Sequence, residues 1–148
     1  MTFLIGIVAG LRAITAPAVV CWAARLGWLN LAGTPLAWMG SAVAVGIFTL
    51  FAIAEYAYDM RPTSGSRKDP PSFVARVLMG ALCGAAVGAN GSALPAGLLL
   101  GAIGAVAGTI GGFELRARLA RMLGRDLPAA LIEDVLGVVL AILAVRLT

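Results

Sequence analysis

Residues 95–112 read PAGLLLGAIGAVAGTIGG, a stretch without a single charged side chain. A transmembrane α-helix needs about 20 consecutive, predominantly apolar residues to cross the hydrocarbon core of a bilayer. Pro95 suits the first turn of such a helix, because the amide hydrogen that proline lacks has no partner there anyway. The stretch therefore predicts a membrane-spanning helix.

The rest of the chain has the same character, because 61% of its 148 residues are hydrophobic and only 12% are charged. The mean hydropathy is +0.99. A soluble domain of this length needs a charged surface that these residues cannot supply. We therefore expect an all-α integral membrane protein, with residues 1–148 forming a single transmembrane domain of about five helices.

Further apolar stretches supply the other spans. We expect them at 35–58, 73–89 and 128–145, with a cytoplasmic loop at 59–72 and an interfacial amphipathic segment at 113–126. The first apolar segment, 2–29, is interrupted by Arg12, Pro17 and Arg25. It predicts either one span kinked near Pro17 or a short membrane helix followed by an interfacial one.

The basic residues predict the orientation. Bases cluster around the loop at 59–72 and again at 116–125, whereas the turns at 30–34 and 90–94 carry no charge. The positive-inside rule places basic loops in the cytoplasm. We expect a multi-pass protein of the bacterial inner (plasma) membrane, with a cytoplasmic N-terminus and an external C-terminus.

Small residues recur on the predicted helices. Gly80, Gly84 and Gly88 share one helical face, which predicts close packing against another helix. The sequence IGIVAG at 5–10 also returns as IGAVAG at 103–108. This match is either chance or an inverted repeat relating spans 1–2 to spans 4–5, an architecture common in transporters.

Ionisable residues within or beside the apolar spans are the candidate site residues, because a charge at the bilayer centre costs about 2.5–3.5 kcal/mol unless it is paired or hydrated. Arg12 lies deepest, and we expect it to pair with Glu133, Asp134 or Glu55. The candidates for binding or transport are Arg12, Glu55, Asp59, Arg67, Arg76, Glu114, Glu133 and Asp134. They form either a scaffold of salt bridges or a charged cavity open to the cytoplasm.

Three segments carry a resemblance to a known family. These segments are GLRAITAP at 10–17, EYAYDMRPTSGSRKDPPSFVAR at 55–76, and the stretch from GGFELRARLARMLG at 111–124 to DLPAALIEDVLGVVLAIL at 126–143. They resemble the bacterial membrane-protein family catalogued as domain of unknown function 4126. The family often has proline directly after the early threonine, whereas here Ala16 separates Thr15 from Pro17. The resemblance implies a bacterial inner-membrane location and supplies no activity.

Three functions remain open. The leading hypothesis is a small transporter or channel-like carrier, working as a homo-oligomer in the lipid bilayer on a small ion or anionic solute. The alternative is a structural or lipid-interacting membrane protein, and the third is an enzyme acting on lipid phosphates. The chain has no histidine and shows no P-loop, HExxH or GxSxG motif, so we expect no enzyme and no cofactor. The bases lie in loops beside apolar runs rather than along one polar face, so we expect no nucleic-acid partner. A metal site is left open, and Cys21 and Cys83 are expected to be buried, apolar-like side chains.

Overall fold

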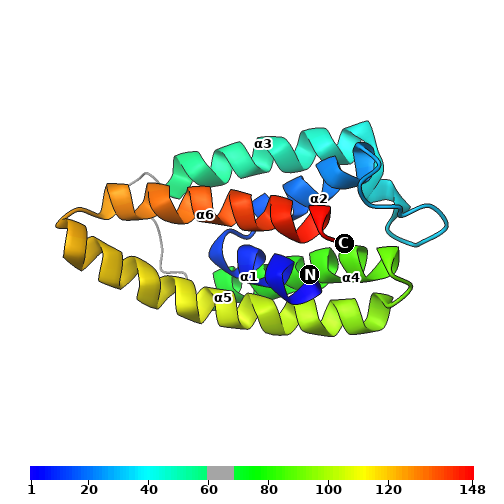
Figure 1. Ribbon diagram of the computed structural model, residues 1–148. Coiled ribbons are helices and arrows are strands. Elements are labelled where there is room, and N and C mark those ends of the chain that lie inside the picture. Colours follow the sequence, from blue (N-terminus) through cyan, green and yellow to red (C-terminus); the bar gives the residue numbers. More distant parts are fainter. Residues whose placement is uncertain (60–68) are drawn as a thin grey trace.

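The computed structural model describes residues 1–59 and 69–148, whose helices lie side by side in a bundle (Figure 1). In chain order they are α1 (Thr2–Leu11), α2 (Thr15–Arg25), the short 3-10 helix η1 (Ala37–Gly40), α3 (Ala42–Asp59), α4 (Pro70–Asn90), α5 (Leu94–Leu123) and α6 (Asp126–Arg146). The described ranges contain no strand. The all-α prediction is confirmed.

Several helices have the properties of membrane spans. Pro70–Asn90, Leu94–Leu123 and Pro128–Arg146 are long and apolar enough to cross a bilayer, and Thr2–Leu11 and Ala42–Tyr58 are shorter apolar helices. Large apolar side chains also cover the outside of the bundle, such as Val43 and Leu50 on α3 and Val135 on α6. A helix that is apolar on all sides suits a lipid environment rather than water. The described helices are therefore compatible with a multi-pass membrane protein.

The first apolar segment forms a helical hairpin. The end of α1 lies beside the first half of α4, where Arg76 contacts Gly10. The loop after α2 is joined to the other end of α4 by a hydrogen bond from the Asn30 amide to the Asn90 side chain. Consequently α1 and α2 run in opposite directions (Figure 1). We call Thr2–Arg25 the N-terminal hairpin, and residues 12–14 at its tip the break.

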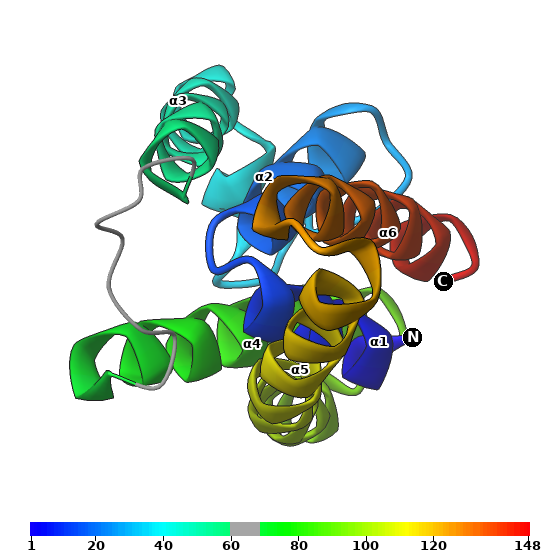
Figure 2. The ribbon, with the colours of Figure 1, turned by 90° about the vertical axis from the view of Figure 1, so that its left-hand side faces the viewer.

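The other helices surround the N-terminal hairpin. Figure 2 shows it in the middle of the bundle, with α1 against α4, α5 and α6, and α2 against α3, α4 and α6. The buried core lies here, and includes Ile5, Val8 and Val20 together with Cys21 and Cys83. Both cysteines are free thiols with no exposed surface, as predicted.

The hairpin changes the topology that follows from the sequence. The expected cytoplasmic N-terminus assumed that residues 2–29 cross the membrane once, but the chain enters and leaves the hairpin at the same end of the bundle. The N-terminus therefore lies at the end with the neutral turns, as does the C-terminus (Figure 1). A hairpin at this depth is tolerated because its non-helical backbone is covered by protein.

With the basic loops in the cytoplasm, this arrangement predicts that both termini are external. Reporter fusions at Met1, after Asn90 and after Thr148 are expected to report one side, and a fusion after Gly124 the other. Enzymatic reporters active on only one side of the membrane provide the measurement. A Met1 fusion on the same side as the Gly124 fusion would restore the five-span topology.

Glycines bring α1, α4 and α5 into backbone contact. A Cβ atom added to Gly84 would lie 2.3 Å from the carbonyl oxygen of Gly97, and one added to Gly101 would lie 2.2 Å from that of Gly80. Gly10 would likewise meet the Ala105 carbonyl at 2.3 Å. The predicted close packing is confirmed, and it involves three helices rather than two.

The same contacts explain the repeated IG-VAG sequence. Gly6 packs on Gly101 and Gly10 packs on Ala105, so the residue numbers rise together and α1 runs in the same direction as α5. An inverted repeat requires the two copies to be antiparallel. The inverted-repeat alternative for these two segments is therefore not confirmed. Both segments supply small residues to one helix interface.

Candidate functional site

The break begins where the sequence cannot continue a helix. Leu11 ends α1, Arg12 is extended with φ −138° and ψ 110°, and α2 begins at Thr15. In a continuous helix the ring of Pro17 would clash with the carbonyl of Ala13, four residues earlier. As the third residue of α2, Pro17 is acceptable because no intrahelical partner awaits its missing amide hydrogen. The chain is thus broken about one turn before the proline near which a kink was expected.

The carbonyl groups at the end of α1 are bound by side chains from other helices. Arg76 on α4 is buried, and its Nη1 donates to the carbonyl oxygens of Leu11 (2.7 Å) and Gly10 (3.0 Å). The Thr109 hydroxyl on α5 lies 3.2 Å from the same Gly10 oxygen. A cation is favourable here because the C-terminus of a helix carries partial negative charge.

The amide groups at the start of α2 bind a carboxylate. Glu55 on α3 accepts hydrogen bonds from the backbone amides of Ala13 (2.9 Å) and Ile14 (3.1 Å), one on each oxygen. An anion is favourable at a helix N-terminus, which carries partial positive charge. Arg76 and Glu55 therefore satisfy opposite sides of the break, and both hold its backbone in place.

Arg12 itself forms the central ion pair. Its Nε donates to Oδ1 of Asp134 on α6 at 2.7 Å, and the Nη2 group contacts the same oxygen. The guanidinium also lies over the ring of Tyr56, 4.5 Å from the ring centre. The predicted pairing of Arg12 with a carboxylate is confirmed, and Asp134 is that carboxylate.

The two partners of this pair differ in their access to water. The Arg12 side chain is 2% exposed and the Asp134 side chain is 13% exposed. Glu133, the neighbour of Asp134, is buried with 1% of its surface exposed. Among the described residues, every buried polar side-chain atom has a hydrogen-bond partner. The site is thus closed in this structure, with Asp134 as its more accessible partner.

The structure brings some of the candidate residues together and places others apart. Arg12, Glu55, Arg76 and Asp134 meet at the break, and Glu133, which precedes Asp134 in sequence, is buried. Glu114 lies exposed on α5, and Asp59 is the last residue of α3. Arg67 lies outside the described residues. Four of the eight candidates thus form one site through hydrogen bonds and ion contacts.

Two contributors were not among the candidates. Tyr56 stacks on Arg12, and its hydroxyl lies 3.4 Å from that of Thr15. Thr109 is a single hydroxyl residue within an otherwise apolar and glycine-rich stretch of helix. A lone hydroxyl in an apolar helix is the signal that could have identified Thr109, because a buried hydroxyl needs a partner.

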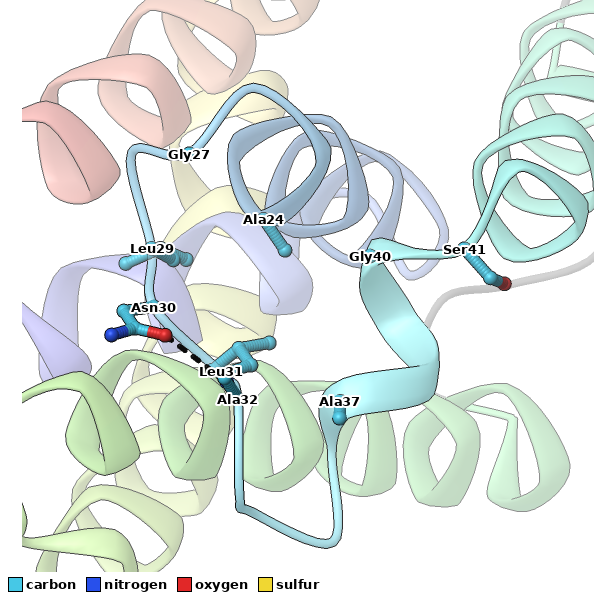
Figure 3. A pocket seen from close by; sticks show the side chains of 9 residues that line it. All are labelled: Ala24, Gly27, Leu29, Asn30, Leu31, Ala32, Ala37, Gly40 and Ser41. Atoms are coloured by element: carbon cyan, nitrogen blue, oxygen red, sulfur yellow. Dashed lines mark hydrogen bonds between the residues drawn. The ribbon is translucent and has the colours of Figure 1, made fainter.

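A pocket lies at the end of α2 opposite to the break. It has a volume of about 630 Å³ and is lined by Ala24, Gly27, Leu29, Asn30, Leu31, Ala32, Ala37, Gly40 and Ser41 (Figure 3). Its lining is uncharged, so it is not the charged cavity expected from the sequence. Within the part of the chain that is described, no group of three or more His, Cys, Asp or Glu residues is placed to hold a metal ion.

Comparison with known proteins agrees with the sequence resemblance. The family model described as domain of unknown function (DUF4126) matches residues 1–147. The chain therefore belongs to this family. No match is found among curated proteins or among solved structures.

Proposed function

For this member of the DUF4126 family, we propose that the chain is a small proton-coupled carrier of anionic solutes, with Arg12 as the anion-binding group and Asp134 as the proton acceptor. The observation that carries the proposal is the Arg12–Asp134 ion pair at a helix break. Broken helices at membrane depth are typical of the ion and substrate sites of carriers. The pair joins the N-terminal hairpin to α6. These two elements can move apart while every helix stays intact.

Charge balance supports the coupling. Removing one partner from a buried ion pair leaves an uncompensated charge and costs about 3–5 kcal/mol. Protonation of Asp134 alone would therefore add one uncompensated positive charge to a closed site. If a solute carboxylate or phosphate replaces the Asp134 carboxylate as Asp134 takes up a proton, the net charge of the site does not change. Asp134 is the member of the pair that a proton can reach, since it is the more exposed one.

Glu55 and Arg76 act as positioning residues in this mechanism. Glu55 binds the two amides that open α2, and Arg76 binds the two carbonyls that close α1. Both keep the break open as non-helical backbone while the Arg12–Asp134 pair separates. The glycine contacts of α1 with α5 make that half of the hairpin the fixed half.

Uptake of labelled acetate, chloride or phosphate into reconstituted vesicles tests the proposal. Wild-type protein is expected to accumulate at least one of these anions when the outside is made acidic. Asp134→Asn is expected to abolish this pH-driven accumulation, because an amide cannot take up the coupled proton. Arg25→Gln, which removes an exposed arginine far from the break, is the matched control and should transport like wild type.

A binding measurement separates transport chemistry from folding. Asp134→Asn resembles the protonated state, so anions are expected to raise its melting temperature more than that of wild type. The double variant Arg12→Gln/Asp134→Asn lacks the anion-binding group and should show no such rise. Wild-type vesicles that accumulate none of the three anions, or an Asp134→Asn protein that accumulates them normally, would contradict the proposal.

A further inference from the structure

Helix α5 is longer than the bilayer requires. It has 30 residues, whereas its antiparallel neighbour α4 has 21, so the two helices measure about 45 Å and 31 Å at 1.5 Å per residue. Gly80 faces Ala105 across their interface. Pro70, the first residue of α4, is therefore level with about Leu115, and the remainder of α5 extends past α4 (Figure 1).

The extension carries a concentrated positive charge. Arg118 and Arg121 lie one turn apart on its surface, and Arg125 follows the left-handed Gly124 that ends the helix. All three side chains are exposed. We call these three residues the arginine tip. Glu114 is exposed about one turn before Arg118, which still leaves a net positive charge.

Apolar side chains are exposed between these arginines. Met122 is 82% exposed, and Leu115 and Leu123 are 41% and 46% exposed. Water alone would disfavour such surface, whereas hydrocarbon alone would disfavour the arginines. The boundary between acyl chains and headgroups accommodates both, with the apolar side chains directed inward and the guanidinium groups at the phosphates.

We infer that the arginine tip is a binding site for the phosphate groups of anionic phospholipids, in the leaflet that faces the basic loops. Guanidinium groups bind phosphate oxygens through paired hydrogen bonds, and their charge attracts an anionic surface. Each arginine near such a surface contributes about fivefold to the preference for anionic over zwitterionic lipid. The three together should give a preference on the order of 100-fold. This inference does not depend on transport activity.

Lipid retention provides the test. Wild-type protein in detergent is incubated with an equimolar mixture of phosphatidylglycerol and phosphatidylcholine, washed, and the retained lipids are quantified by mass spectrometry. The Arg118→Gln/Arg121→Gln/Arg125→Gln variant is expected to lose at least about tenfold of the phosphatidylglycerol preference. The corresponding triple lysine variant should keep most of it. Arg25→Gln, at the opposite end of the bundle, should match wild type.

Wild-type protein also offers a test that needs no variant. Raising the salt concentration from 0.1 to 1 M shortens the Debye length from about 10 Å to 3 Å and should lower the retained phosphatidylglycerol several-fold. Inorganic phosphate at the concentration of the lipid should not displace it, because phosphate lacks acyl chains. The inference would be overturned if the triple glutamine variant retained as much phosphatidylglycerol as wild type. It would also be overturned if Arg25→Gln lost as much phosphatidylglycerol as the triple glutamine variant. Displacement by inorganic phosphate would also overturn it.

Discussion

Replacement of Arg12 by glutamine is expected to lower the free energy of unfolding by about 3–5 kcal/mol, because the Asp134 carboxylate would lose its cation in a closed site. Asp134→Asn should also lower the free energy of unfolding, since it removes the carboxylate that contacts the buried Arg12 guanidinium. The double variant carries neither charge and should recover most of the loss. Chemical denaturation in detergent, analysed as a double-mutant cycle, measures this coupling directly.

Arg25→Gln is the control for this cycle, and it should change stability by less than about 0.5 kcal/mol because Arg25 is exposed. The free energy of unfolding of Arg12→Lys should lie between those of wild type and Arg12→Gln. An ammonium keeps the charge but cannot reproduce the contacts of both guanidinium nitrogens with Asp134. Additive losses in the double variant, with no coupling energy, would show that the two side chains do not act as a pair.

The second large effect is expected at the glycine interface. Gly101→Ala would place a methyl group 2.2 Å from the Gly80 carbonyl oxygen and 2.8 Å from the Gly84 Cα atom. Both contacts are with backbone, so α4 and α5 must move apart, and the loss of stability should reach about 3 kcal/mol, the upper end of the range for overpacking. The denaturation midpoint in detergent provides the measurement.

Gly111→Ala is the matched control on the same helix. No atom lies within 4 Å of the Cβ that this substitution adds, and Gly111 is exposed. Alanine is the better helix former by up to about 1 kcal/mol, so this variant should be as stable as wild type or more stable. Equal losses for Gly101→Ala and Gly111→Ala would mean that helix propensity, not the contact between α4 and α5, decides the outcome.

Several features of this protein follow from the sequence alone. The membrane class follows from hydropathy, because the cost of placing a side chain in lipid depends mainly on that side chain. The Gly80, Gly84 and Gly88 series predicts a close helix contact, because residues four apart share a helical face. The need of Arg12 for a carboxylate follows from its depth, because every arrangement of the helices must compensate the same buried charge.

Other features depend on the tertiary structure. By charge alone, Glu133, Asp134 and Glu55 are equally plausible partners for Arg12, and the rotation and height of α6 bring Asp134 to it. Hydropathy likewise does not predict the reversal of the chain at residues 12–14. An apolar segment has the same composition whether it crosses the bilayer or turns back within it. At 10 residues, α1 is about 15 Å long and cannot span the bilayer alone. Arg76, Glu55 and the glycines of α5 settle its direction, because these distant residues satisfy and cover the backbone at the break.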